Sequence, residues 1–426
     1  MSEFQAYFTN DGSVGLYSKD YDDIYHSASG ALTEAYEKFV CPVNWDNLLK
    51  YDDIKVLDIC YGIGYNTKSF LNYIFENKKK LLKIKNEIKK IFSKNFSIDN
   101  NIDTIHTNNN YSLNNQNNID KIYTNNIFNN ISVTALDNDE ILTGLSPFIK
   151  TGVKNFKKNH ELIDKLKLNK YFSDKPVINY KINNSINYEI LSQLIEKNPQ
   201  ILNNDDLLKV LSDKSNSSYF IAHLKNLFLS MHINTFKNIN LLNLHNIYYR
   251  YLTNCYKNSF KHNNIWNFNF NIKINDARQS IKEDKNIYNL IFLDAFTPSK
   301  CPCLWSYDFF KELHSHLSED GMLLTYSSAA QIRNAMITAG FVVGKIYNDR
   351  LNKFQGTVAV KNIDLIKHPL SESDLGLLKT KAGIFYRDKN LSSQNEAIIM
   401  VHKTEVENSN LMSSSMYLKT RRNNGL

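Results

Sequence analysis

The sequence predicts an α/β fold with a doubly wound, mostly parallel sheet, and three observations carry this prediction. Short apolar runs alternate with helical patterns, a glycine-containing turn follows the first run, and several runs end in aspartate. Alternating strands and helices are typical of a parallel sheet with helices on both faces. Such Rossmann-like sheets bind ligands outside the carboxyl ends of their strands. We therefore expect the acids that end these runs to lie close together.

The apolar runs predict seven strands, at residues 54–59, 131–136, 271–274, 290–293, 322–326, 341–346 and 357–360. Helical spacing predicts helices over residues 64–75, 139–149, 305–317 and 329–339. The stretches between these elements have a different composition. Between residues 101 and 130, 12 of 30 positions are Asn, which leaves too little apolar surface to offset the entropy of ordering.

Composition shifts divide the chain into six parts. We expect an N-terminal segment with the first half of the core at 1–75 and a disordered Asn/Lys-rich insertion at 76–130, for which an RNA-contacting arm is the alternative. The second strand and its helix follow at 131–150, and a helical insertion or subdomain at 151–269. The second half of the core is expected at 270–404 and a disordered tail at 405–426.

Charge and cysteine content restrict the class of protein. The 426 residues carry a net charge of +8, which permits an RNA partner. Five cysteines without a CxxC pair argue against a disulfide framework, and the spacing Cys301-Pro-Cys303 fits no common zinc site. We read this pair as an accident of a loop. No run approaches about 18 apolar residues. We expect a cytoplasmic protein without a metal or a membrane partner, and the sequence leaves its oligomeric state open.

The turn after the first strand indicates the cofactor. It runs from Asp58 through Cys60 and Gly62 to Gly64, and glycines there allow a sharp bend and a close approach of ligand to backbone. The pattern G-x-G-x-x-G of dinucleotide enzymes is missing. Asp58 can hold the cationic amino group of a methionine moiety, which favours S-adenosyl-L-methionine as cofactor. Cys60 occupies the usual position of the first glycine, which puts cofactor affinity in doubt.

Two further acids follow strands. Asp137 can accept hydrogen bonds from both hydroxyls of a bound ribose; its alternative is to cap the next helix, for which Asp139 is the better candidate. Asp276 can accept a hydrogen bond from an adenine amino group, and the alternative is a solvated strand end. With the turn, these residues predict a class I S-adenosyl-L-methionine-dependent methyltransferase of Rossmann-like fold.

Asp294 is the catalytic candidate. An apolar strand delivers it into a loop that contains Phe296 and Pro298. Methyl transfer to an amine needs the amine positioned and deprotonated, and one carboxylate beside it can do both. The alternative is a structural or capping aspartate.

At this point the chain resembles a known family, the methyltransferases that complete 5-methylaminomethyl-2-thiouridine at the wobble position of bacterial tRNA. The resemblance rests on blocks that run in order through about half the chain. They lie at residues 9–13, 25–34, 62–66, 293–310, 321–341, 356–359 and 386–388, the last two being similar to the stand-alone branch.

The resemblance implies methyl transfer to the primary amine of 5-aminomethyluridine in tRNA. It also implies that Asp294 contacts the amine, that Asn66 belongs to the cofactor turn, and that Tyr25, His26, Ser27 and Phe296 lie near substrate or cofactor. No second nucleotide turn follows residue 362, so we expect no flavin-dependent oxidase domain. Alternatives are an amine methyltransferase acting on a small molecule or a protein, a weakened remnant of the fold, and a spermidine-synthase type. The last would need a second acid soon after Asp294, where the sequence has Ala-Phe-Thr-Pro.

Overall fold

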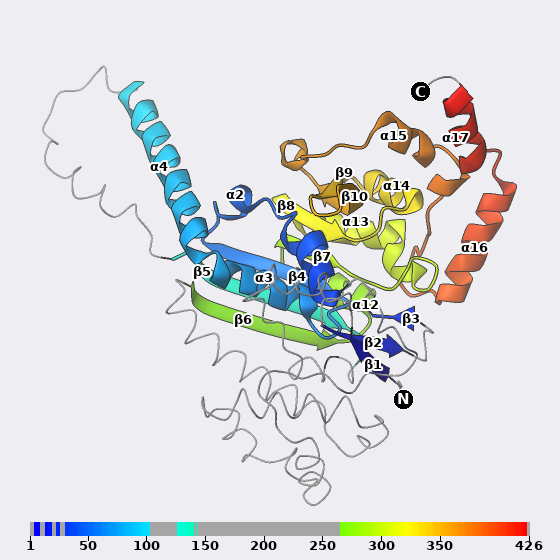
Figure 1. Cartoon of the computed structure of the whole chain (residues 1–426), viewed down its shortest axis with the longest axis horizontal. Helices are drawn as coiled ribbons and strands as arrows, with labels where there is room; N and C mark the ends of the chain where they lie inside the picture. Colours follow the sequence, from blue (N-terminus) through cyan, green and yellow to red (C-terminus); the bar gives the residue numbers. More distant parts are fainter. Residues whose placement is uncertain are drawn as a thin grey trace, which may run out of the picture.

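The computed structural model describes residues 4–8, 13–18, 23–25, 30–102, 126–139, 143 and 265–423. Its centre is a seven-stranded sheet in the order β6-β5-β4-β7-β8-β10-β9 (Figure 1). The strands are β4 (Asp53–Ile59), β5 (Phe128–Asp137), β6 (Ile265–Ile274), β7 (Tyr288–Leu293), β8 (Leu317–Thr325), β9 (Val342–Asn348) and β10 (Lys353–Val360). All seven predicted strands are present.

Five strands run parallel, from β6 at one edge to β8. Strand β10 is antiparallel to both β8 and β9, so β9 and β10 close the other edge as a hairpin. Strand order reverses at β4, with β5 on one side and β7 on the other. The prediction of a doubly wound, mostly parallel Rossmann-like sheet is therefore confirmed, and β4 ends where such sheets bind ligands.

The two faces of the sheet carry separate cores. Along β7, Leu290 and Phe292 pack on one face, and Ile291 and Leu293 on the other, as the two-residue period of a strand requires. The first face is covered by the π-helical turn η1 (Ala35–Val40), α2 (Trp45–Leu48), α3 (Tyr65–Glu76) and α4 (Lys78–Ile102). The second is covered by α12 (Ala277–Lys282), α13 (Tyr307–Ser315) and α14 (Ala330–Thr338).

Helix α4 corrects the expectation that residues 76–130 are disordered. Its 25 residues run away from the amino ends of the strands (Figure 1). The side chain of Lys85 is fully buried, and its Nζ donates to the carbonyl oxygens of Tyr51 (2.8 Å) and Ile127 (2.7 Å) and pairs with Asp52 (2.8 Å). This ammonium ties the helix to the sheet, which offsets the polar composition that predicted disorder. Residues 103–125 lie outside the described part, and 126–130 lead into β5.

The C-terminal stretch is also more ordered than expected. Helices α15 (Glu372–Leu378), α16 (Asn395–Asn408) and α17 (Ser414–Asn423) account for most of it (Figure 1). A Cβ at Gly376 would lie 1.8 Å from Tyr417 Oη, so only glycine lets α17 pack this closely on α15. The Lys381 amide donates to Met412 (2.9 Å). The prediction of a disordered tail from residue 405 is therefore wrong for residues 405–423.

Other boundaries differ as well. Strand β6 begins at Ile265, inside the stretch expected to be a helical insertion, of which residues 151–264 lie outside the described part. Of the helix expected at 139–149, only Asp139 and helical Thr143 lie within the described part. The helix expected at 305–317 is split, because Ser306 caps α13 after the 3₁₀ turn η6 (Pro302–Trp305), and β8 begins at Leu317.

No strand was predicted before residue 54, but the structure has a small antiparallel sheet near the N-terminus. It consists of β1 (Phe4–Phe8), β2 (Val14–Ser18) and β3 (Asp23–Ile24), and a short helix α1 (Ala31–Glu34) follows. Among the helices described, none combines the length and apolar character needed to cross a bilayer.

Candidate functional site

A cavity of about 620 Å³ opens at the carboxyl ends of β4, β5 and β7. Its size falls within the range of small-molecule sites, about 300–1,000 Å³. Its walls combine acids, aromatic rings and three thiols, contributed by Tyr25, Glu34, Lys38, Phe39, Cys60, Tyr61, Gly62, Tyr65, Asn66, Leu136, Asp137, Asn138, Asp276, Ala277, Arg278, Asp294, Ala295, Phe296, Thr297, Cys301, Cys303, Leu304, Tyr326, Gln394 and Asn395.

The turn after β4 forms the floor of the cavity. Its backbone enters the left-handed region three times within five residues, at Cys60 (φ 62°), Gly62 (φ 55°) and Gly64 (φ 82°). Glycine adopts this region without penalty, whereas a residue with a Cβ is strained there. The interpretation of Cys60 as a replacement for glycine therefore agrees with the backbone. Cys60 and Gly62 line the cavity, and Gly64 instead caps the start of α3.

The predicted contact of Asp58 with the cofactor stays a prediction, because the structure places this side chain beneath the cavity. Its side chain is fully buried and absent from the cavity lining. Oδ2 accepts from the backbone amide (3.2 Å) and the hydroxyl (2.6 Å) of Thr67, and Oδ1 is buried without a hydrogen bond. Burial, together with the nearby charges of Asp294 and Asp137, raises the pKa of Asp58 to about 7. In this geometry Asp58 holds the first turn of α3 beneath the cavity floor.

Asp137 lies on the wall of the cavity at the end of β5. Oδ2 accepts from the Gly62 amide (2.7 Å) and Oδ1 from the Asp139 amide (2.9 Å), so the carboxylate bridges the ends of two strands. Burial raises its pKa to about 6. The position agrees with the predicted ribose contact, which stays a prediction.

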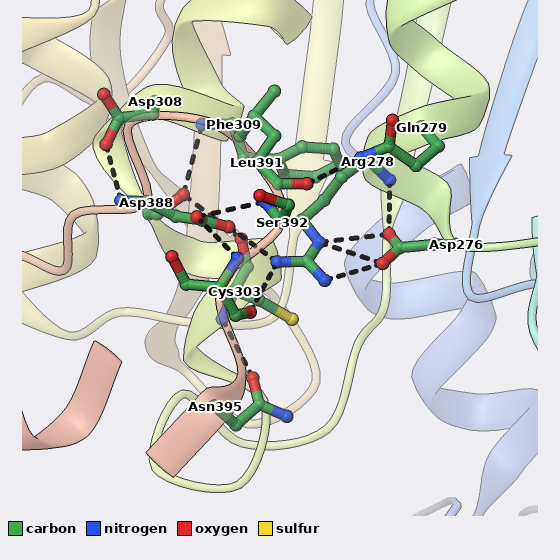
Figure 2. A network of polar contacts seen from close by, with 12 residues as sticks. Asp276, Arg278, Gln279, Cys303, Asp308, Phe309, Asp388, Leu391, Ser392 and Asn395 are labelled. Carbon is green, nitrogen blue, oxygen red and sulfur yellow. Dashed lines mark hydrogen bonds and ion pairs between the residues drawn. The ribbon is translucent and has the colours of Figure 1, made fainter. Parts of the chain in front are cut away.

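Asp276 lines the cavity but already has a cationic partner, which the sequence did not reveal. It caps α12, and both of its oxygens accept from Arg278, with Nη2–Oδ2 at 2.6 Å (Figure 2). Arg278 Nη1 also donates to Asp388 (2.6 Å), which is buried. The guanidinium therefore joins the cavity wall to the segment before α16. A contact of Asp276 with adenine stays a prediction.

Asp294 directly follows β7, lines the cavity and is half-buried. Its amide donates to Ile59 (3.2 Å), and its Oδ2 accepts from Asn66 Nδ2 (2.9 Å), so the turn and the catalytic candidate hold one another. Burial raises its pKa to about 6, the Asn66 hydrogen bond opposes this, and the charge of Glu34 adds to it. At neutral pH most of this carboxyl is ionised and can accept a proton.

Glu34 and Lys38 are site residues that reasoning from sequence missed as a pair. The two residues lie one helical turn apart on the cavity wall and form an ion pair (2.7 Å). Lys38 Nζ also lies 5.6 Å from the ring centre of Tyr326. The i,i+4 spacing is a weak signal, since it occurs on most surface helices.

The residues taken from the family resemblance are placed in part. Tyr25, just after β3, packs its ring on that of Phe296, with centroids 4.7 Å apart, and both line the cavity. His26 and Ser27 lie outside the described residues. Within the described ranges, no three His, Cys, Asp or Glu side chains are arranged to hold a metal ion.

The acidic and aromatic residues of the cavity fit S-adenosyl-L-methionine. Its sulfonium and amino groups are cationic, and Glu34, Asp137, Asp276 and Asp294 bring acids to the walls. Burial disfavours the charged forms of Asp137 and Asp294, so a cation bound beside them stabilises these ionised carboxylates. The aromatic walls offer faces for a base. The cavity therefore has the charge and the surfaces of a site for a cationic nucleoside.

Comparison with known proteins also points to S-adenosyl-L-methionine as cofactor. Residues 241–362 match a family model described as S-adenosyl-L-methionine-dependent methyltransferase. An uncharacterized protein of Methanocaldococcus jannaschii is 32% identical over 157 residues, which are 36% of this chain and 44% of that protein. The tRNA 5-methylaminomethyl-2-thiouridine biosynthesis bifunctional protein MnmC of Burkholderia vietnamiensis is 33% identical over 75 residues, 18% of this chain and 12% of that protein.

The matched stretches thus span less than half the length of these two relatives. The crystal structure of MNMC2 from Aquifex aeolicus matches with a TM-score of 0.51 at 19% identity, covering 96% of this chain and 86% of that one, a likeness of fold. Through residues 241–362 the chain is thus similar to S-adenosyl-L-methionine-dependent methyltransferases, and the acidic cavity at the switch point of the sheet fits that cofactor.

Proposed function

We propose that this methyltransferase acts on the primary amine of 5-aminomethyluridine, or its 2-thio form, at the wobble position of tRNA. The observation that carries the proposal is Asp294, held on the cavity wall by Asn66 and set next to Phe296 in the chain. An acid so placed suits an amine acceptor better than a neutral one. The match to a protein named for tRNA 5-methylaminomethyl-2-thiouridine biosynthesis supports the choice of acceptor.

We assign the residues of the cavity the following roles in this reaction. S-Adenosyl-L-methionine, when bound, supplies the methyl group on a cationic sulfur. Asp294 orients the substrate ammonium and accepts its proton, so that the nitrogen lone pair can face the methyl carbon. Asn66 keeps the carboxylate in position, and the rings of Tyr25 and Phe296 offer a surface for the uracil. Asp137, which lines the cavity and accepts from the Gly62 amide, would bind the ribose of the cofactor.

The tRNA partner is supported by the charge of α4. Residues 78–90 contain seven lysines and one glutamate, and Lys79, Lys80 and Lys83 are exposed. Lysines along one helix can follow a phosphate backbone. Helix α4 lies at the amino ends of the strands, and the cavity lies at their carboxyl ends. A tRNA bound to both would therefore extend along the whole length of the strands.

Transfer of label tests the proposal. The purified chain is incubated with methyl-labelled S-adenosyl-L-methionine and tRNA that carries the aminomethyl group but lacks the final methyl, and the nucleosides are then separated. We expect label on the wobble uridine. Label absent from that nucleoside, with the acceptor amine verified by mass, would refute the proposal. Label on a polyamine or a protein lysine in parallel reactions would point to an amine methyltransferase of another substrate class.

A further inference from the structure

Two thiols meet in the wall of the cavity. Cys301 and Cys303 flank Pro302 at the start of η6, and their Sγ atoms lie 3.6 Å apart. Both are free, and both line the cavity. The sequence spacing alone suggested an accident of a loop, but in the fold the two sulfurs lie side by side in the cavity wall.

A cation lies beside one of them. Figure 2 shows Cys303 next to Arg278, whose guanidinium is held by Asp276 and Asp388. The Cys303 amide donates to Asn395 Oδ1 (3.3 Å), which fixes the backbone of this residue. The hydrogen bond from Cys301 and the charge of Arg278 hold the pKa of the Cys303 thiol below its ordinary value. Because the thiolate is the nucleophile, Cys303 is the sulfur that reacts first.

The distance between the sulfurs is suited to bond formation. A disulfide has an S–S length of about 2.05 Å, so the two atoms must approach by about 1.5 Å. Both belong to one short loop, so rotation of the two side chains can supply most of this movement. The cavity gives a small oxidant access to both.

We propose that Cys301 and Cys303 form a dithiol that a peroxide oxidises to a disulfide, and that this modification weakens cofactor binding. The Cys303 thiolate attacks one oxygen of hydrogen peroxide, the O–O bond breaks, and the released hydroxide takes a proton to become water. Cys303 is then a sulfenic acid. The Cys301 thiol gives up its proton and attacks the sulfenic sulfur, the S–O bond breaks, and a second water leaves.

In sum, two thiols and one peroxide give one disulfide and two waters, with two electrons passing from sulfur to peroxide. A dithiol reductant returns the pair to thiols and becomes a disulfide itself. Asn395 fixes the backbone of Cys303, so the S–S bond must form by movement of the two side chains. Because both side chains line the cavity, this movement changes the shape of its wall. Bond formation also removes a sulfur that, as a thiolate, would partly offset the positive charge of Arg278 beside a cationic ligand.

The sequence provides a clean readout. Trypsin cleaves after Lys300 and Lys311, so peptide 301–311 contains these two cysteines and no others. The full chain is treated with limiting hydrogen peroxide, quenched, alkylated in denaturant and digested. We expect peptide 301–311 to escape alkylation and to be lighter by two hydrogen atoms, and to take two alkyl groups after dithiothreitol. Affinity for S-adenosyl-L-methionine should fall several-fold on oxidation and recover on reduction.

Two variants complete the test. Cys303→Ser should leave Cys301 open to alkylation, and Cys41→Ser, which changes an exposed thiol outside the cavity, should behave as the parent. Two findings would overturn the proposal: a pair that is oxidised no faster in the folded chain than in the chain unfolded in urea, or an oxidised pair with unchanged cofactor affinity. The peptide mass does not depend on the methyl acceptor, so failure of the proposed function would leave this result intact.

Discussion

Cys60 is the residue whose chemistry and backbone disagree most. Its φ of 62° suits glycine, yet it carries a Cβ and a thiol at the floor of the cavity. Holding a non-glycine residue in the left-handed region costs on the order of 1 kcal/mol or more. The sheet and α3 on either side fix the turn, and their burial offsets this cost.

Replacing Cys60 with glycine should therefore stabilise the chain. We expect Cys60→Gly to raise the free energy of unfolding by about 1 kcal/mol, measured by urea denaturation, with cofactor affinity at least equal to that of the parent. Cys60→Ala is the matched control, because it removes the thiol but keeps the Cβ and hence the strain. Equal stability of the two variants would show that the turn is not strained at this position.

Asp294 offers a prediction about turnover. Asp294→Asn keeps an oxygen that can accept from Asn66 but cannot accept a proton, so cofactor affinity should change little and turnover should fall by about 10²–10⁴-fold. In the parent, the ionised form is the active one and its pKa is raised to about 6, so the rate should fall as the pH falls through about 6. Methyl transfer measured at several pH values checks both; turnover near that of the parent would assign Asp294 a structural role.

At the scale of elements, the sequence predicted those parts that local patterns determine. The strands β4, β5 and β7 are apolar runs that end in acids, and burial on both faces leaves little choice of conformation for such runs. The acids at their ends were predicted to meet, and Asp137 and Asp294 do so in one cavity.

What the sequence concealed depends on contacts between distant residues. Helix α4 is polar, and its order rests on Lys85 meeting carbonyls 34 and 42 residues away. Arg278 meets Asp388 across 110 positions. Asp58 lies within β4, and its hydrogen bonds to Thr67 on α3 could not be read from the sequence, so its predicted contact with the cofactor stays a prediction.

Helix α4 carries the prediction about RNA. Reversing the charge of Lys79, Lys80 and Lys83 to Glu should weaken tRNA binding and reduce the slope of log K against log salt concentration by up to about 3. Cofactor affinity should not change, because the helix lies at the other end of the strands. The control changes three exposed lysines elsewhere, Lys389, Lys403 and Lys419. Equal loss of binding in both variants would remove α4 from the interface.

Over the whole molecule, buried acids determine how stability responds to pH. Burial raises the pKa of Asp58 to about 7 and of Asp137 and Asp294 to about 6. Between their unfolded values near 3.8 and these values the folded chain binds more protons, so its stability falls as the pH rises. His314, with a lowered pKa, opposes this below 6.5, and acids with lowered pKa values such as Asp374 matter at more acidic pH.

The free energy of unfolding without cofactor should therefore be lower at pH 7.5 than at pH 5. For each such group the limit is about 1.4 kcal/mol per pH unit. Urea denaturation at the two pH values measures the difference, and Asp58→Asn, whose amide oxygen can still accept from Thr67, should reduce it. A stability that is constant or rises between these pH values would contradict the ionisation assigned to the three acids.

Arg278 forms ion pairs with both Asp276 and Asp388, and so connects the cavity wall to the segment before α16. Asp276 lines the cavity, and Asp388 accepts from the amides of Ser392 and Ser393 just before α16. A ligand that draws on Asp276 changes how firmly Arg278 holds Asp388. Opening of the C-terminal segment and occupancy of the cavity are then thermodynamically linked. By reciprocity, whatever stabilises α16 from outside changes the affinity of the cavity for its ligand by the same factor, although this helix does not line most of the site.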